Sequence, residues 1–229
     1  MKQVDQGILI HRINYSENSL IITLFTSSNG VQKFISKGVK KKTGSLFPMG
    51  IYEIDYYKRP TADLGSITNI VQIKHHFGIS NSPIKQLISF FIADLIKQTQ
   101  KSESKDDNTF NFIKNSIQKL DNTNNISYFL CLFLLEYIHT LGITPYIEEE
   151  KSNCFDLEKG VFTNNKTDSK NIIRNKTVEC IIDYYNNNEL NPNSNFKEVL
   201  NICLRYLSYH IPNFNMEKSI DIIREILYD

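Results

Sequence analysis

The period of the hydrophobic pattern changes once along this chain, near Pro83. Apolar and polar side chains alternate before this residue, and apolar side chains recur every three or four positions after it. Alternation places apolar side chains on one face of a strand, whereas the longer period places them on one face of a helix. The sequence therefore predicts an α+β protein of two domains, a β domain over residues 1–80 and an all-helical domain over residues 81–229.

The alternating region divides into five expected strands that are separated by turns. We expect these strands over residues 4–14, 19–26, 31–37, 47–58 and 66–74. Asn29-Gly30 predicts a type I′ hairpin turn, because both residues tolerate positive φ angles. Five short strands with almost no helical period are typical of a small closed barrel, so we expect a five-stranded OB-fold.

Helical periodicity governs the rest of the chain, with one interruption. Ser82-Pro83 is a usual helix start, and Gly142 is expected to end the most apolar helix, over residues 126–141. Further helices are expected around residues 84–96, 110–120, 171–185, 196–209 and 216–228. The polar stretch 144–170 predicts a loop or a hairpin.

Charge is divided unequally between the two parts of the chain. Residues 1–80 carry ten basic and five acidic side chains, whereas residues 81–229 carry sixteen basic and twenty acidic ones. The excess of positive charge in the first part indicates a polyanion as its partner. Because no apolar run suits a signal peptide or a bilayer span, we expect a cytoplasmic protein without a membrane partner.

A run of lysines is the sharpest local feature. Residues 37–45 lie between two expected strands and hold Lys37, Lys40, Lys41 and Lys42. Lysine is a mobile charge that follows a phosphate backbone without reading sequence, and the glycines in this segment let the chain approach a ligand closely. The segment therefore predicts a phosphate-binding loop, although such a run is also compatible with a solvated loop.

Neighbouring strands carry further residues that suit a nucleic-acid site. The basic candidates are Arg12, Lys33, Lys58 and Arg59. Aromatic rings alternate along the same strands, and we expect Phe25 and Phe34 to face the core. Tyr15 and Tyr57 are expected to point outward, where each ring can stack on a base.

No catalytic pattern is recognisable in the sequence. It contains no G-x-x-x-x-G-K-[ST], G-x-G-x-x-G, G-x-S-x-G or H-E-x-x-H motif. His75-His76 would point to opposite faces at a strand end, so we expect surface histidines rather than metal ligands. The cysteines, Cys131, Cys154, Cys180 and Cys203, are widely spaced, which favours free thiols in a reducing compartment. We therefore expect no enzymatic activity, no cofactor and no bound metal.

Two strings carry a resemblance to a known family. GILIHRINYSENSLIITLFTSSNGVQKFISKGVKKKTGS and FPMGIYEIDYYKRPTADLGSI together resemble the N-terminal domain of the RecO family of bacterial recombination mediators. The similarity rests on the order of elements, with a strand ending at Tyr15-Ser16-Glu17, a second ending at Phe25-Thr26, a hairpin glycine at Gly30, and Lys37-Gly38 opening a basic loop. Leu141-Gly142-Ile143-Thr144-Pro145 is similar to the family's segment after its central helix.

The resemblance implies a function and partners. It implies an OB-fold that binds single- and double-stranded DNA and anneals complementary strands, in a protein associated with the nucleoid. Implied partners are RecR and the acidic C-terminal tail of single-strand binding protein, with which the family helps to load RecA onto covered DNA. The tail would bind in the helical domain, where Arg174, Lys176 and Arg205 are candidates because they lie near apolar helix faces. Some members carry a four-cysteine zinc module, but only Cys154 falls in the corresponding region here.

Two other interpretations remain open from the residues alone. The chain could be a protein-interaction scaffold whose barrel docks on a partner rather than on DNA, since its apolar helical part is large. It could also be an OB-fold of the translation type that prefers RNA, because neither the lysines nor the aromatic rings distinguish the two nucleic acids.

Overall fold

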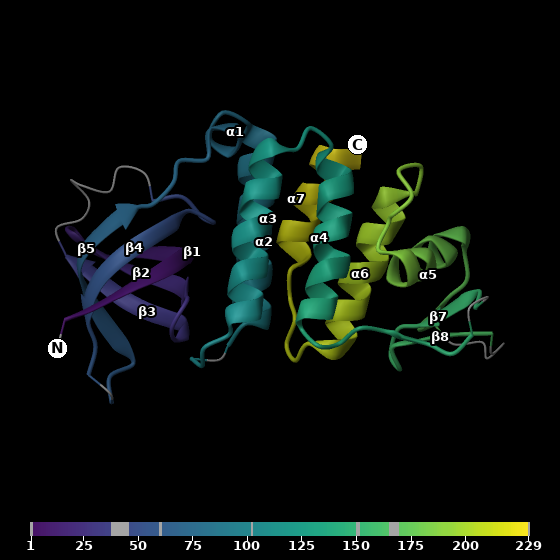
Figure 1. Cartoon of the computed structure of the whole chain (residues 1–229), viewed down its shortest axis with the longest axis horizontal. Helices are drawn as coiled ribbons and strands as arrows, with labels where there is room; N and C mark the ends of the chain where they lie inside the picture. The colour runs from purple at the N-terminus through teal and green to yellow at the C-terminus, as the bar shows by residue number, and fades with distance from the viewer. Residues whose placement is uncertain are drawn as a thin grey trace. The chain divides into compact units, whose positions relative to one another are not determined.

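A computed structural model describes residues 2–37, 46–59, 61–101, 103–149, 152–164 and 170–228 (Figure 1). The chain divides into two compact units. The first comprises Met1–Asn122 with Met216–Ile226, and the second comprises Thr123–Asn215 with Leu227–Asp229. Residues 81–122, which we expected to open the second domain, belong to the first compact unit. The boundary at residues 80 and 81 remains a prediction about domains that fold separately.

The first unit contains a closed five-stranded barrel. Its strands are β1 (Gln3–Ser16), β2 (Ser19–Thr26), β3 (Gly30–Lys37), β4 (Ile51–Tyr57) and β5 (Leu64–Gln72), which pair in the order β1-β2-β3-β5-β4. β3 and β5 are parallel, and the other neighbours, including β4 and β1, are antiparallel. This order confirms the predicted OB-fold barrel. β4 begins at Ile51 rather than at residue 47, because the chain turns through Met49, whose φ is 64°.

Alternating side chains fill the barrel, as the pattern predicted. Leu20, Ile22 and Leu24 of β2 point inward and are buried. Phe34 is fully buried and meets the ring of Tyr56 edge to face, with 5.0 Å between centroids. A glycine at position 65 is required here, since a Cβ would come within 2.6 Å of the Phe34 ring. The prediction that Phe34 belongs to the core is therefore confirmed.

The turn between β2 and β3 differs from the expected type I′ turn. Thr26 pairs with Gly30, so three residues connect the strands instead of two. Gly30 has a φ of 63°, but Asn29 does not have a positive φ. The Thr26 hydroxyl stabilises this three-residue turn. It accepts a hydrogen bond from Asn29 N at 3.2 Å and donates one to Gly30 O at 3.0 Å.

Helices complete the first unit. They are α1 (Phe77–Ser80), α2 (Pro83–Thr99), α3 (Asp107–Asn122) and most of α7 (Glu217–Tyr228). The predicted start of α2 is confirmed, since Ser82 caps it by accepting a hydrogen bond from Lys85 N. α2 packs against β1. Phe25 is buried, as expected, and its ring lies 6.0 Å from that of Phe110 of α3.

The second unit combines helices with a small sheet. Its helices are α4 (Ile126–Thr140), α5 (Lys176–Asn187) and α6 (Phe196–His210), and α4 packs on α6. Strands β6 (Tyr146–Ile147), β7 (Cys154–Asp156), β8 (Val161–Thr163) and β9 (Ile172–Ile173) pair in the order β6-β8-β7-β9. The C-terminal part is thus helical with a small sheet, and residues 144–170 contribute more than the expected loop or hairpin. Phe155 and Phe162 stack across β7 and β8 with 4.2 Å between centroids, which anchors this sheet.

Among the helices that the described residues form, none is long and apolar enough to span a bilayer.

Candidate nucleic-acid interface

Two rows of outward-facing side chains cross the barrel wall. They alternate with buried residues such as Ile22 and Phe34, and strand pairing places the members of each row side by side. The first row consists of Ile13, Ile21, Ile35, Ser66 and Tyr57. The second row consists of His11, Thr23, Lys33 and Leu64. β2 and β3, which are the strands that bind oligonucleotides in OB-folds, lie in the middle of this face.

A groove of about 580 Å³ opens over these rows, and we call it the basic groove. Its floor is aliphatic and is formed by Ile10, Ile13, Ile21, Val31 and Leu64. The barrel contributes His11 and Lys33 to its rim, the last turn of α2 contributes Lys97, and the segment after α2 contributes Lys101. Lysines from two different elements therefore converge on one apolar hollow. This arrangement can bind a polyanion whose charged groups lie at the rim and whose apolar surface meets the floor.

His11 gives the basic groove a titratable ring. Burial, reinforced by the charge of Lys97, lowers the pKa of His11 below its ordinary value of 6.5, and Asp94 opposes this shift. His11 is therefore neutral at pH 7. A bound anion would stabilise the protonated ring and raise its pKa.

Strand β4, which pairs with β1 and β5, carries negative charge on its outer face. Glu53 and Asp55 alternate with buried residues along β4 and so point outward. Asp55 forms an ion pair with Lys2 at 3.0 Å, and this pairing neutralises one of the positive charges of the N-terminal region. A polyanion is therefore attracted to the side that carries the basic groove and repelled from β4.

The structure places three of the predicted residues around this face. Lys33 lies at the rim of the basic groove. Lys37 is exposed at the end of β3, opposite Ser19. Tyr57 ends the first row and is 48% exposed, which leaves its ring accessible for stacking.

Arg12 and Tyr15 are placed differently. Arg12 belongs to the row of Ile22 and Phe34, so it lies on the opposite side of the β1–β2 ribbon from Lys33, and the structure does not bring these two cations together. Tyr15 is 64% exposed and sits at an irregularity in the pairing of β1 with β2. Its ring is accessible, as expected.

The remaining basic candidates of the barrel fall into two groups. Lys58 is bound to Glu103 at 3.2 Å and also to Gln32, whereas Arg59 is exposed after the end of β4. Lys40, Lys41 and Lys42 lie outside the described residues, so their role as a phosphate-binding loop remains a prediction.

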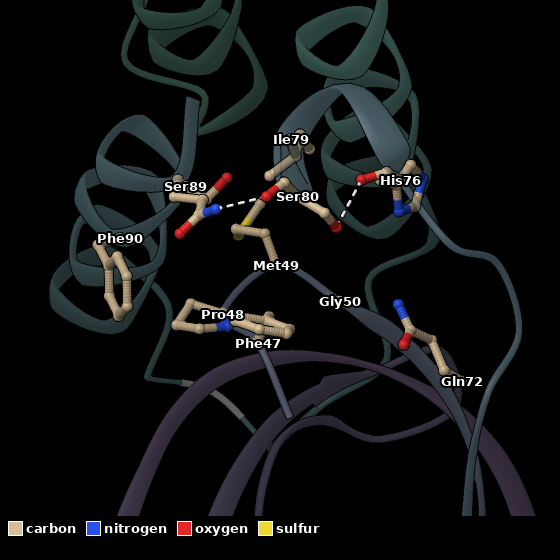
Figure 2. Close-up of a pocket in the computed structure, with 11 residues that line it drawn as sticks. Phe47, Pro48, Met49, Gly50, Gln72, His76, Ile79, Ser80, Ser89 and Phe90 are labelled. Atoms are coloured by element: carbon tan, nitrogen blue, oxygen red, sulfur yellow. Dashed lines mark hydrogen bonds between the residues drawn. The ribbon is translucent and has the colours of Figure 1, made fainter. Parts of the chain in front are cut away.

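A second hollow of the first unit lies between the turn before β4 and helices α1 and α2 (Figure 2). We call it the neutral pocket; its volume is about 30 Å³, and Phe47, Pro48 and Phe90 form its apolar walls. Hydrogen bonds organise one side of it, since Gln86 Nε2 donates to Ser80 O at 2.7 Å and Ser80 Oγ donates to His76 O at 2.9 Å. Among the described residues, no lysine or arginine lines it.

His76 corrects one prediction at this pocket. We expected a surface histidine, but His76 is only 6% exposed. His76 is the residue directly before α1, and its side chain is buried. The side chain of His75 is exposed. Burial lowers the pKa of His76 below 6.5, with Asp121 opposing the shift and Lys74 and His75 adding to it.

Comparisons with known proteins agree with this architecture. Residues 1–75, which contain the barrel, match the family model described as recombination protein O N terminal. The chain is 27% identical to the DNA repair protein RecO of Flavobacterium psychrophilum, covering 96% of this chain and 97% of that protein. It is 24% identical to the DNA repair protein RecO of Phocaeicola vulgatus, covering 99% of each. The chain is thus similar to the RecO family, through the model over its first 75 residues and through relatives that align with nearly its whole length.

The candidates for binding a partner of the RecO family lie in the second unit. Arg205 of α6 donates from Nη2 to Lys170 O at 3.3 Å, which places it beside the segment that leads to Arg174 and Lys176. All three side chains are exposed. None of them lines the basic groove or the neutral pocket, so their role in binding a tail peptide stays a prediction.

Some members of the RecO family carry a zinc module, but we expected no bound zinc here because only Cys154 falls in the corresponding region. Across the described ranges, no three His, Cys, Asp or Glu side chains are grouped so that they could hold a metal ion. The four cysteines are free, and Cys154 is buried in β7. The small sheet of the second unit is held by the stacked rings of Phe155 and Phe162.

Sequence reasoning missed His11, Lys97 and Lys101. Lys97 and Lys101 follow the apolar face of α2 and are four positions apart, which is a weak sign that they share a side. The decisive fact is that α2 packs on β1, and this contact joins residues more than eighty positions apart. Local periodicity carries no information about such a contact.

Proposed function

We propose that this chain, which is similar to the RecO family, acts in DNA repair and recombination by binding DNA in the basic groove. The observation that carries the proposal is the convergence of Lys33, Lys97 and Lys101 over an aliphatic floor on the β2–β3 face of an OB-fold. The names of the relatives, which are DNA repair proteins, support the same role.

Each part of the groove has a task in this proposal. The lysines neutralise phosphates and follow a single strand without reading its sequence. The aliphatic floor accommodates the sugars and base edges, and Tyr57 offers a ring for stacking at the end of the first row. Lys37 at the end of β3, and Lys40, Lys41 and Lys42 that follow it in the sequence, are proposed as further phosphate contacts.

Annealing of complementary strands follows from binding alone. Two DNA strands repel each other, and a basic surface that holds one strand and tolerates a second lowers this repulsion. No bond is made or broken, so we assign no catalytic residue. We propose that the chain binds single- and double-stranded DNA and promotes annealing in this way.

The assembly in which the chain acts is also proposed. RecR and the acidic tail of single-strand binding protein are the expected partners, and together they would help to load RecA onto covered DNA. Arg174, Lys176 and Arg205 are the proposed contacts for the tail, because their exposed charges suit an acidic peptide. Titration of a labelled tail peptide against charge reversals at these three positions tests this contact.

Removal of the groove lysines tests the DNA-binding proposal. We expect K33A/K97A/K101A to weaken binding of a labelled single-stranded oligonucleotide about tenfold or more, since each lysine contributes about 0.5 to 1 kcal/mol. The logarithmic salt slope should become shallower by about 2, at about 0.7 per lost contact. Fluorescence anisotropy over a series of salt concentrations measures both quantities.

A matched variant controls for net charge. K105A/K114A/K218A removes three exposed lysines of the same compact unit that do not line the groove. Its affinity should stay closer to that of the wild-type protein. Equal losses in the two triple variants would contradict the groove assignment. Absence of any DNA affinity, together with a protein partner that survives nuclease treatment, would favour the scaffold interpretation.

A further inference from the structure

An internal carboxylate occupies a cluster of donors beside the basic groove. Glu103 Oε2 lies 3.2 Å from Lys58 Nζ and 3.2 Å from Gln32 Nε2. The two donors come from different parts of the barrel, because Gln32 belongs to β3 and Lys58 follows β4. Glu103 itself comes from the segment between α2 and α3, so the contact joins that segment to the barrel wall.

The donors are held in place independently of Glu103. Gln32 is only 4% exposed, and its Nε2 also donates to Asn29 O at 3.0 Å. The Gln32 Oε1 atom accepts a hydrogen bond from Lys58, whose side chain is only 15% exposed. A charged group and an amide are therefore prearranged to donate to one oxygen.

Glu103 is the least constrained member of this cluster. Its side chain is 62% exposed. The hydrogen bonds from Lys58 and Gln32, and the charges of Lys58 and Lys33, lower the pKa of this carboxyl. An exposed carboxylate on a connecting segment is easily replaced by another anion, because its ion pair contributes little free energy.

The carboxylate of this cluster lies near the groove in which we propose that DNA binds, although Gln32 itself faces the inner side of β3. Lys33 lines the groove and its charge acts on Glu103. Lys33 of β3 also pairs with Leu64, the first residue of β5. Lys58 directly follows β4, so it begins the connection that leads to Leu64. A strand that leaves the groove past Lys33 can bring a following phosphate to Lys58 around the edge of β3.

We propose that Lys58 and Gln32 form a phosphate subsite, which Glu103 fills in the free protein and from which a DNA phosphate displaces it. This proposal rests on the proposed DNA-binding function and adds a place and a competitor to it. A phosphate oxygen accepts the same hydrogen bonds as a carboxylate oxygen. Because DNA must first displace Glu103, the internal carboxylate lowers the affinity of the free protein for DNA.

Neutralising Glu103 tests the competition. We expect E103Q in the full chain to bind a labelled oligothymidylate about two- to fivefold more tightly than the wild-type protein, which is the range of an exposed ion pair. Glu148 is an exposed glutamate of the second unit, so E148Q makes the same change in net charge away from the cluster. E148Q should leave the affinity close to that of the wild-type protein.

A double variant shows whether Lys58 mediates the effect. K58A should weaken DNA binding, and the gain from E103Q should disappear when Lys58 is also absent. If E103Q and E148Q have equal affinities, or if E103Q gains as much in the K58A background, the subsite proposal is overturned while DNA binding in the groove stands. If neither the wild-type protein nor E103Q binds the oligonucleotide, the proposed function is overturned together with the subsite.

Discussion

The basic groove and the neutral pocket belong to the same compact unit but differ in what they can bind. The groove is about 580 Å³ in volume and has lysines at its rim, whereas the pocket is about 30 Å³ and has no lysine or arginine among the described residues that line it. Both have apolar walls, and each contains a histidine whose pKa burial lowers. The difference therefore lies in charge and size rather than in apolar character.

This contrast teaches that the helices next to the barrel decide where its ligand binds. α2 forms one wall of both hollows: its last turn and the residues that follow supply Lys97 and Lys101 to the groove, and its middle supplies Ser89 and Phe90 to the pocket. The barrel contributes strand residues to the groove, whereas it contributes mainly the turn before β4 to the pocket. The positive charges at the C-terminal end of α2 therefore distinguish the basic groove, which can bind a polyanion, from the neutral pocket.

The largest expected effect extends the contrast to the lysine run. K40A/K41A/K42A should weaken binding of single-stranded DNA about tenfold and make the salt slope shallower by about 2, because three phosphate contacts are lost. F47A/F90A at the neutral pocket should change the affinity by less than about twofold, as expected for exposed substitutions away from a binding surface. Fluorescence anisotropy compares the variants, and thermal unfolding checks that each one is folded.

Two outcomes would break the contrast. An unchanged affinity in the lysine-run variant would remove residues 40–42 from the site. A loss in F47A/F90A as large as that in K33A/K97A/K101A would show that the ligand also covers the neutral pocket.

The fold was predictable from the sequence because its main signals are local. Alternation in β2 and β3 gave the strands and their buried faces, and the change of period at Pro83 gave the start of α2. The small sheet of the second unit was not predictable in this way. β6 and β9 have two residues each, which is too short for a period of two to be recognised.

The candidate site was predictable only in part. Lys33, Lys37 and Tyr57 could be found because strand alternation places them on the outer face. The separation of Arg12 from Lys33 depends on an irregularity in β1 near Ile10, which changes the side to which the following residues point. Glu103 could not be found, because its contact with Lys58 joins residues 45 positions apart.

A smaller effect is expected from His11 in the basic groove. Because the pKa of His11 is lowered in the free protein and a bound phosphate would raise it, DNA binding should take up a proton, and affinity should rise as the pH falls below about 6.5. H11Q should lack this rise, which amounts to no more than about fivefold. Affinities measured between pH 7.5 and about 5.5 test this, with H75Q as a matched control that keeps the rise. A pH profile that H11Q leaves unchanged would assign the proton to another group.

The smallest expected effect concerns the stability of the protein. It distinguishes His76, which we expect to affect stability, from His11, which we expect to affect DNA binding. Burial lowers the pKa of His76, so the folded protein binds its proton less readily than the unfolded chain does. Stability is therefore complete above the ordinary value of 6.5 and declines as the pH falls through it. H76Q should flatten this decline at a cost of about 1 kcal/mol at neutral pH, since Gln packs less well in this buried position. Urea unfolding at several pH values measures the free energy of unfolding. The wild-type decline should persist in H75Q, because the His75 ring is exposed.

If H76Q weakened DNA binding instead, the neutral pocket would share the role of the groove.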